Sequence, residues 1–291
     1  MNSASSTLPC TIAALHLHPL KSCAGLSVRE ALLIETGLEL DRAWMVVDSG
    51  GEMLTQRELP RLALVRPLMQ LSDMVLRAPG MLNLHLLLDS AEDATRVGIW
   101  GDIVKAYDMG NLAAQWFSDY LGRPARLVRF DPEEKRLADP QWSGGLAPDA
   151  AGAAFADGFP LLVTSNASLA DLNNRLAARE APAVTMERFR PNIVLDDLSA
   201  WDEDNLGDLQ IDTAEGPVLL RLTKPCVRCS IPNVDPATGI SGPEPGDTLA
   251  LFRSDARMGG GITFGMNAVV VSGVDRMVRV GQAATASWVN D

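Results

Sequence analysis

The sequence predicts a mixed, β-rich α+β fold, and three observations support this prediction. Short apolar runs separated by turn residues follow one another from Thr11 to about Leu88, and similar runs return after Leu209. Two segments place their apolar residues at helical spacing instead. The chain has 291 residues, 47% of them hydrophobic, which is enough to bury one large core or two of ordinary size.

The N-terminal runs predict a series of short strands. They are "TIAALHLHPL", "REALLIETG", "RAWMVVDSGGEMLT", "RLALVRPLMQLS" and "MVLRAPGMLNLHLLL". Within the third run, Asp48 to Gly51 supplies residues that tolerate a positive φ angle between two alternating segments, which predicts a β-hairpin. The segment "RVGIWGDIVKAYDMG", residues 96–110, continues the strands.

The first predicted helix is "GNLAAQWFSDYLG", residues 110–122. A glycine stands at its end, where helices commonly have their C-terminal cap. The apolar residues expected to form its buried stripe are Leu112, Trp116, Phe117, Tyr120 and Leu121.

The second half of the chain begins after a strand, "RPARLVRF", and a connection over residues 131–158 that is rich in Pro, Gly, Ala and Asp. This connection is the expected domain boundary. The segment "FPLLVTSNASLADLNNRLAAR" then predicts a buried strand, a turn and a helix with Ser168 as N-cap and Leu169, Leu172 and Leu176 as its apolar stripe. Further strands are expected in "LQIDTAEGPVLLRLTKP" and "MNAVVVSGVDRMVRVGQAATAS".

The charge balance argues against a nucleic-acid partner. Against 37 acidic residues the chain has 25 basic ones, a net charge of −12, and no run or stripe of basic residues stands out. No run of about 18 apolar residues exists, and the start "MNSASSTLPC" lacks the regions of a secretory signal. We therefore expect no membrane segment and a cytoplasmic protein.

The chain has four cysteines, Cys10, Cys23, Cys226 and Cys229. They are too few for a disulfide scaffold, and the last two form a CxxC motif in "LTKPCVRCSIPNVDPATG". A structural zinc site would need four ligands, and no second CxxC exists. A redox dithiol is usually followed by a helix, whereas two prolines and a turn follow here. Two packed thiols are the ordinary alternative. A thiolate bound to a metal is favoured by the cations Lys224 and Arg228, which could also hold a phosphate or a pterin.

The stretch "CVRCSIPNVDPATG" resembles the signature of the MOSC superfamily, in the branch that includes the mitochondrial amidoxime-reducing component and bacterial relatives that give resistance to N-hydroxylated bases. The resemblance extends along the chain through "LHLHPLKSCAGLSVREALLIETGLELDRAWMVVD", "GEMLTQRELPRLALV", "AAQWFSDYLG", "FPLLVTSNASLADLNNRL" and "RFRPNIVL". It implies an N-terminal β-barrel-like domain, residues 1–125, and a β-barrel MOSC domain with a few helices, residues 126–291. The molybdenum cofactor would lie between them.

By this resemblance Cys229 is the molybdenum ligand, a role that suits a soft, deprotonated sulfur, and Cys226 is a packed thiol. Arg57 and Asp235 are further active-site candidates, although both could be ordinary turn or ion-pair residues. The lysine, arginine, hydroxyl and amide groups expected at the cofactor suit an anionic, hydrogen-bond-rich pterin. The residues implied to bind it are Lys21, Ser22, Arg42, Thr164, Ser165, Arg190, Asn192, Val227, Arg228 and Asn267.

The resemblance implies a molybdenum-dependent oxidoreductase that reduces amidoximes, hydroxylamines and N-hydroxylated bases to the N–H compound and water. The alternatives are a carrier of the cofactor or of its sulfur, without turnover, and a thiol or zinc protein. The sequence lacks an iron–sulfur cysteine cluster and a flavin or nicotinamide fingerprint. Electrons are therefore expected from an external donor protein such as ferredoxin, flavodoxin or a cytochrome b5-type carrier with its reductase.

Two departures from the family pattern bear on these expectations. Asn267 stands where some relatives have an aromatic residue, which leaves the shape of the pocket and the range of substrates open. Several bacterial relatives continue into a C-terminal ferredoxin-like domain with four cysteines, whereas this sequence ends at "VGQAATASWVND".

Overall fold

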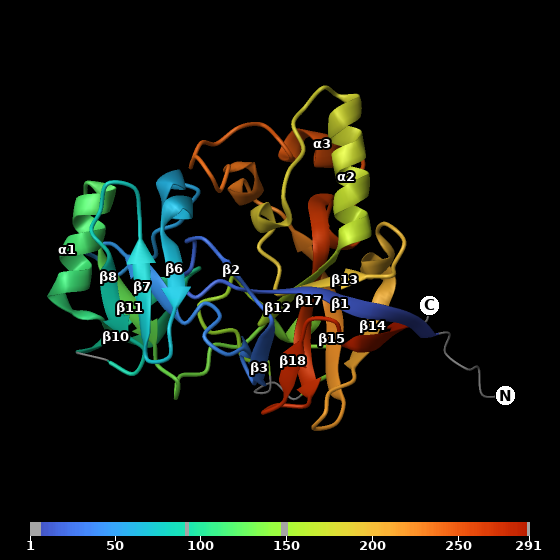
Figure 1. The fold of residues 1–291 in the computed structure, drawn as a ribbon, viewed down its shortest axis with the longest axis horizontal. Helices are drawn as coiled ribbons and strands as arrows, with labels where there is room; N and C mark the ends of the chain where they lie inside the picture. Colours follow the sequence, from blue (N-terminus) through green and yellow to red (C-terminus); the bar gives the residue numbers. More distant parts are fainter. Residues whose placement is uncertain (1–6, 91–92, 147–150, 290–291) are drawn as a thin grey trace.

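The structure is a computed structural model that describes residues 7–90, 93–146 and 151–289 (Figure 1). Strands dominate it, which confirms the predicted β-rich α+β fold. The first six residues of "MNSASSTLPC", residues 147–150 of the expected connection and the last two residues lie outside the described part. The helices of the described part are α1 (Gly110–Leu121), α2 (Asn166–Ala178) and α3 (Gly246–Ala250).

Seven strands form a closed barrel. Their order is β12, β13, β1, β19, β14, β15 and β17, and β17 pairs with β12 to close the ring. Only the pair β12 and β13 is parallel among the ladders of this ring. The strands of the barrel are β1 (Thr7–Leu17), β12 (Leu161–Ser165), β13 (Ile193–Asp196), β14 (Leu206–Ile211), β15 (Val218–Val227), β17 (Gly261–Ser272) and β19 (Ala283–Trp288). Two short strands attach to it, β2 (Leu26–Val28) to β1 and β16 (Ser254–Asp255) to β17.

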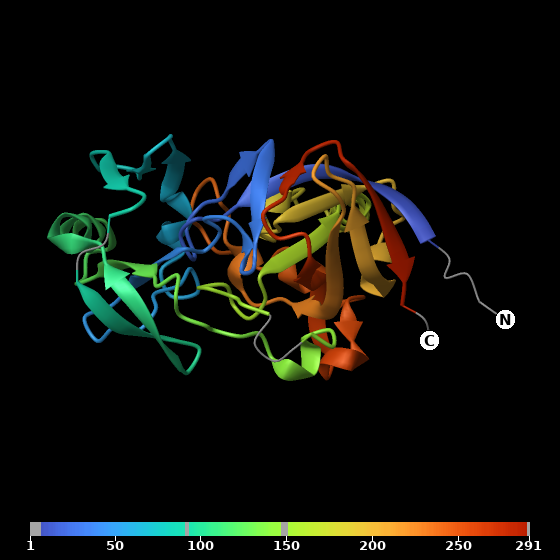
Figure 2. The same cartoon turned by 90° about the horizontal axis from the view of Figure 1, so that it is seen from below.

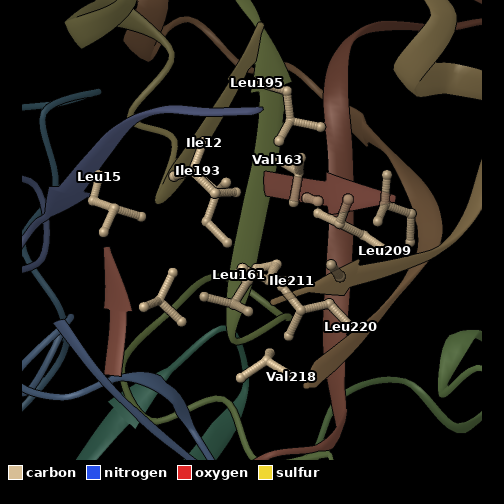
Figure 3. Close-up of a cluster of buried hydrophobic side chains, with 14 of the residues drawn as sticks. Ile12, Leu15, Leu161, Val163, Ile193, Leu195, Leu209, Ile211, Val218 and Leu220 are labelled. Atoms are coloured by element: carbon tan, nitrogen blue, oxygen red, sulfur yellow. The ribbon is translucent and has the colours of Figure 1, made fainter. Parts of the chain in front are cut away.

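Alternating apolar residues of these strands fill the barrel interior. Figure 3 shows Leu161, Val163, Ile193, Leu209 and Leu220 from four strands pointing toward one another. Burying one such side chain stabilises the fold by about 1.5 to 3 kcal/mol relative to leaving it in water.

Strand β1 reaches the same interior with a change of register. Ile12 and Leu15 are both fully buried although they are three residues apart, because the register against β13 shifts between Ile12 and Ala14.

Closure of the barrel depends on a glycine. Gly265 on β17 has a φ angle of +77°, and an added Cβ would come within 2.7 Å of Thr164 Cγ2 and 2.8 Å of the Val163 carbonyl oxygen. Because that carbonyl belongs to the paired strand β12, it cannot move away without opening the ladder.

Most of residues 43–130 form a second lobe, which lies on the left in Figure 1, away from α2 and α3, and again on the left in the view from below in Figure 2. It holds a four-stranded and a three-stranded sheet, and α1 packs Phe117 and Tyr120 into its core beside Trp44. The strands of these two sheets are β5 (Trp44–Val47), β9 (Ala94–Ile99), β10 (Asp102–Asp108), β11 (Arg126–Phe130), β6 (Arg66–Met69), β7 (Asp73–Arg77) and β8 (Leu84–Leu87). The short 3-10 helices of the described chain are Pro60–Leu64, Pro140–Trp142, Met186–Arg188, Asp202–Asn205, Ile231–Asn233 and Ala256–Met258.

Several local predictions are confirmed in this lobe, and one is wrong. The hairpin forms after β5, where the Asp48 amide donates to the Glu52 carbonyl at 2.9 Å. Helix α1 ends at Gly122, which has the left-handed φ angle of 68° expected of a C-terminal cap. However, Leu112 is 73% exposed, and the neighbouring Ala113 is buried in its place.

The N-cap of α2 also differs from the prediction. Ser165 is the cap, and its hydroxyl accepts from the Ser168 amide at 3.1 Å. The Ser168 hydroxyl donates instead to the buried Glu203 carboxylate at 2.8 Å. Ser168, which the sequence predicts as the N-cap, therefore binds a residue that is 35 positions further along the chain.

The two ends of the chain meet in the barrel, since β1 lies between β13 and β19. A further sheet joins β3 (Glu30–Ile34) and β4 (Gly37–Leu38) to β18 (Met277–Arg279). The N-terminal part thus contributes strands to both lobes, while residues 125 and 126 remain our proposed domain boundary. No helix of the described residues combines the length and apolar character that crossing a bilayer requires.

Candidate active site

A cavity of about 140 Å³ lies where segments of the N-terminal half meet the barrel. Of the thirteen site residues proposed from the sequence, ten line its wall. These ten are Lys21, Ser22, Arg42, Arg57, Arg190, Asn192, Val227, Arg228, Cys229 and Asn267. They come from six separate places in the chain, residues 21–22, 42, 57, 190–192, 227–229 and 267, so the fold and not sequence proximity brings them together.

Positive charge dominates the wall of this cavity. Among the described residues its wall contains five cationic side chains, Lys21, Arg42, Arg57, Arg190 and Arg228, against a single carboxylate, that of Asp157. The whole chain carries a net charge of −12, so this concentration of cations runs against the overall balance. A low-dielectric cavity with this charge favours an anionic ligand.

Arg190 is the cavity cation whose surroundings most clearly favour a bound anion. Its Nη1 donates to the Cys23 carbonyl oxygen, and no carboxylate of the described residues lies within ion-pair distance of it. Burial, together with the adjacent charge of Arg42, lowers the pKa of Arg190 to about 10. Arg190 is half-buried, and two adjacent guanidinium groups with little water around them repel each other unless a negative group joins them.

Arg42 and Asn192 hold this pair of arginines in place. Arg42 Nη1 donates to Asn192 Oδ1 at 3.0 Å and Nη2 to the Arg190 carbonyl oxygen at 2.9 Å, and Arg42 also pairs with the buried Asp41. Asn192 Oδ1 accepts in addition from the Leu162 amide of β12 at 3.1 Å. The guanidinium is therefore fixed to the edge of the barrel.

Three of the cavity residues have a strained backbone. The φ angles of Ser22, Arg42 and Arg190 are 64°, 50° and 57°, in the left-handed region that residues other than glycine rarely adopt. Such conformations cost on the order of 1 to 3 kcal/mol each and persist where the surroundings impose them, often at functional sites.

The CxxC motif presents one exposed and one half-buried thiol to the cavity. Cys229 is exposed, and the Ile231 amide donates to its Sγ at 3.5 Å. Cys226 Sγ lies 3.0 Å from Arg228 Nη1. Arg228 Nε is buried without a hydrogen-bond partner in the described structure, so the guanidinium has unused donor capacity.

The other two cysteines are internal to the fold. Burial raises the pKa of Cys23 to about 12, and burial together with Asp197 raises the pKa of Cys10 to about 11. Neither lines the cavity. Among the described residues no group of three or more His, Cys, Asp or Glu side chains is placed to hold a metal ion. Of the two cavity cysteines, Cys229 is the exposed one.

The remaining three proposed residues do not line the cavity. Thr164 Oγ1 donates to Met186 Sδ at 3.4 Å, and Ser165 caps α2 and donates to Glu203. Asp235 accepts from the amides of Ala237 and Thr238 at 2.8 and 3.1 Å and pairs with Arg188 at 3.1 Å. Asp235 thereby fixes the turn that follows Cys229.

Lys224 also lies differently from what the sequence suggests. Its Nζ is 5.6 Å from the Trp142 ring centroid and 5.8 Å from that of Phe159, and Lys224 does not line the cavity. Of the two cations next to the cysteines, only Arg228 contacts a cysteine sulfur.

Asp157 is the main site residue that sequence reasoning missed. Its carboxylate pairs with the buried Lys21, accepts from Trp100 Nε1 at 3.2 Å and lies 3.9 Å from Arg57 Nη2. Loss of surrounding water would raise the pKa of Asp157, but Lys21, Arg57 and Trp100 outweigh this and hold it below its ordinary value. Asp157 falls in the connection without a clear period, so no sequence signal could have found it.

A buried histidine next to the cavity makes stability depend on pH. His18 is 3% exposed, its Nε2 lies 3.1 Å from the Pro191 carbonyl oxygen, and Nδ1 has no partner in the described structure. Burial, followed by the charges of Arg190 and Arg42, lowers the pKa of His18 well below its ordinary value. Below about pH 6.5 the unfolded chain therefore binds a proton that the folded chain does not.

We expect the free energy of unfolding to fall as pH drops below about 6.5, by up to about 1.4 kcal/mol per pH unit from His18. Urea denaturation at pH 7 and pH 5.5 measures this, with His18→Gln as the comparison because glutamine retains a donor but does not titrate. His16, whose pKa is lowered mainly by burial, adds to the slope in both proteins. An unchanged slope in His18→Gln would exclude His18 as the cause.

Two family models match the chain, the MOSC N-terminal beta barrel domain over residues 9–124 and the MOSC domain over residues 151–285. The mitochondrial amidoxime reducing component 2 of Rattus norvegicus is 37% identical over 252 residues, which cover 84% of this chain and 72% of the rat protein. The mitochondrial amidoxime-reducing component 1 of Homo sapiens is 35% identical over 251 residues, with 84% and 72% covered. Among solved structures, the YuaD protein of Bacillus subtilis aligns over 98% of this chain and 99% of its own, at 8% identity and a TM-score of 0.40.

Proposed function

Because the chain belongs to the MOSC-domain family that includes the mitochondrial amidoxime-reducing components, we propose that it is a molybdenum-cofactor-dependent oxidoreductase that reduces N-hydroxylated compounds. The products are the corresponding N–H compound and water. Family membership associates the chain with the molybdenum cofactor, and its relatives are named for the reduction of amidoximes. The substrate range and the external electron-donor protein belong to the proposal.

The observation that carries this proposal is the combination of one accessible thiol with five cationic side chains in one cavity. A pterin phosphate needs fixed cations and hydrogen-bond donors, and a molybdenum centre needs a soft anionic sulfur. The unpaired Nε of Arg228 and the lack of an ion-pair partner for Arg190 in the described structure fit such an anion. The residues present therefore fit the cofactor.

Each cavity residue has a proposed role in holding the cofactor. Cys229 would be the metal ligand, and Lys21, Arg190 and Arg228 would bind its anionic groups. Arg42, fixed by Asn192 Oδ1 at 3.0 Å, orients Arg190 through the carbonyl contact at 2.9 Å. Further contacts are assigned to Ser22, Asn192, Val227 and Asn267, all of which line the cavity.

The three proposed residues outside the cavity would act through the backbone. Asp235 positions the turn after Cys229 through its bonds to the Ala237 and Thr238 amides. Thr164 and Ser165 end strand β12 and begin α2, and they would support the wall from behind. A direct contact between these three side chains and the cofactor would require the loops to move.

The bound cofactor would supply two-electron redox chemistry. Each turnover consumes two electrons and two protons, breaks one N–O bond, and releases the N–H compound and water. Arg57 lines the cavity with a side chain 28% exposed, so it can donate a hydrogen bond to the hydroxyl oxygen of a substrate that enters from solvent. The donor must be another protein, and such electron-transfer contacts are typically small, below about 1,200 Å².

We expect the purified protein to contain molybdenum and pterin, and to reduce benzamidoxime to benzamidine with a chemical electron donor. NADH or NADPH alone should give no turnover, and adding a reductase with its carrier protein should restore it. Product formation by chromatography and molybdenum by elemental analysis are the measurements. Molybdenum without turnover under any donor would indicate a cofactor carrier, and robust turnover with nicotinamide alone would contradict the need for a donor protein.

A further inference from the structure

A cluster of Asp157, Trp100 and Arg57 at the cavity is only partly explained by the cofactor. The Asp157 side chain is 62% exposed, and its Oδ1 binds Lys21 Nζ and accepts from Trp100 Nε1 at 3.2 Å. Its Oδ2 faces Arg57 Nη2 at 3.9 Å, which is too long for a hydrogen bond. Asp157 Oδ2 can therefore still accept a hydrogen bond from a ligand, although Oδ1 of the same carboxylate is paired with Lys21.

Trp100 presents an exposed indole beside this carboxylate. Trp100 and Gly101 form the two-residue turn between β9 and β10, and their positive φ angles, 52° and 91°, are those that such a hairpin turn requires. The turn therefore explains the backbone of Trp100. It does not explain the choice of an indole, because the side chain is 45% exposed and gains little from burial.

Arg57 shows what kind of group this arrangement accepts. The central carbon of its guanidinium lies 4.4 Å from the Trp100 ring centroid, and the same guanidinium faces Asp157 Oδ2. A planar, delocalised cation is thus stacked on an indole and turned toward a carboxylate oxygen, two contacts that recognise such cations. Since the ion-pair distance is long and Arg57 is 28% exposed, this occupant is weakly held.

We propose that Trp100 and Asp157 form a binding site for the amidinium or guanidinium group of a ligand, which takes the place of the Arg57 guanidinium. This inference rests on the proposed function, because the anionic groups of the cofactor would balance the cations of the cavity wall and leave the exposed Asp157 carboxylate to a cationic ligand. Reduction of an amidoxime gives an amidine, which takes up a proton from water at neutral pH, whereas the amidoxime itself is uncharged. The Trp100–Asp157 site therefore binds the amidine product, or a cationic N-hydroxyguanidine, more tightly than a neutral amidoxime.

Calorimetric titration of the full-length protein with benzamidine, and with benzamide as the neutral compound of the same shape, tests the site without any turnover. We expect benzamidine to bind at least about tenfold more tightly than benzamide, as charge-assisted contacts imply. Asp157→Asn, which keeps the shape of the side chain, should remove this preference. Trp100→Ala should weaken benzamidine binding by about 3- to 30-fold.

Arg57→Ala should act in the opposite direction, because it vacates the site, and benzamidine should then bind several-fold more tightly. Arg61→Ala is the matched control: its guanidinium also lies 4.4 Å from an aromatic ring, that of Tyr120, but it does not line the cavity. This control should bind benzamidine as the unmodified protein does. Thermal unfolding of each variant shows that the fold is retained.

Equal affinity for benzamidine and benzamide, or weaker benzamidine binding in Arg57→Ala, would overturn the proposed site. The result is separable from the proposed function because it requires neither turnover nor an electron donor. If the protein shows this binding pattern but does not reduce benzamidoxime, the Trp100–Asp157 site is supported and the proposed oxidoreductase activity is contradicted. If the protein reduces benzamidoxime but does not bind benzamidine more tightly than benzamide, only the Trp100–Asp157 site is contradicted.

Discussion

Replacing Cys229 with serine is expected to abolish molybdenum-dependent reduction, by more than about 100-fold in rate, whereas replacing Cys226 with serine leaves most of it. Changes in residues that merely support a metal ligand already cost about 10- to 100-fold, so loss of the ligand itself should cost more. Cys229 is the exposed thiol of the cavity, and its sulfur accepts from the Ile231 amide at 3.5 Å. Cys226 is half-buried and occupied by Arg228 at 3.0 Å.

The pair of variants is its own matched control, because both replace one sulfur with one oxygen in the same cavity wall. Molybdenum content and the rate of benzamidoxime reduction are measured on each, with circular dichroism to show that the barrel is intact. Equal loss in both variants would favour a dithiol or another shared use of the two sulfurs. Loss of activity in Cys226→Ser alone would mean that Cys226, and not Cys229, is the metal ligand.

The regular elements could be predicted because their signals are local. Alternation over a few residues shows a strand, and Gly122 in the left-handed conformation shows where α1 ends. The errors arise where a distant partner decides. Ser168 is drawn to Glu203, which leaves Ser165 as the cap of α2, and packing of α1 on its sheets buries Ala113 while Leu112 stays exposed.

The closed barrel could not be derived from local patterns alone. Strand β1, at the start of the chain, lies between β13 (Ile193–Asp196) and β19 (Ala283–Trp288), and β17 must reach both β15 and β12. The register shift in β1 and the φ angle of +77° at Gly265 become meaningful only once those partners are known. The expectation of a barrel came from the family resemblance, and the ladders explain how this chain makes it.

The candidate site shows the same division. Resemblance pointed to thirteen residues that are scattered along the chain, and the fold brings ten of them into one cavity. Asp157 was missed because its partner Lys21 is 136 residues away and nothing in its own segment marks it. Thr164 and Ser165 lie at the C-terminal end of β12, but their hydroxyls donate to Met186 and Glu203 and do not line the cavity.

Replacing Arg190 with alanine is expected to lower affinity for the cofactor by about 10- to 150-fold, since a hydrogen bond to a charged group contributes about 1.5 to 3 kcal/mol. The free energy of unfolding should stay unchanged or rise, because the variant removes a half-buried cation that has no carboxylate partner in the described structure and lies beside Arg42. Molybdenum and pterin per chain after dialysis, together with urea denaturation, measure the two effects. Arg221→Ala is the control, since it removes an arginine of the same barrel that pairs with Asp208 outside the cavity.

The contrast with Arg42→Ala separates binding from folding. Arg42 pairs with Asp41, which is 6% exposed, so its removal leaves a buried carboxylate unpaired and should cost about 3 to 5 kcal/mol of stability in addition to cofactor. Arg190→Ala should lose cofactor alone. Should Arg190→Ala keep its full cofactor content and unfold more easily instead, the arginine would be a structural residue, and the anion-binding role of this wall would fall to Lys21 and Arg228.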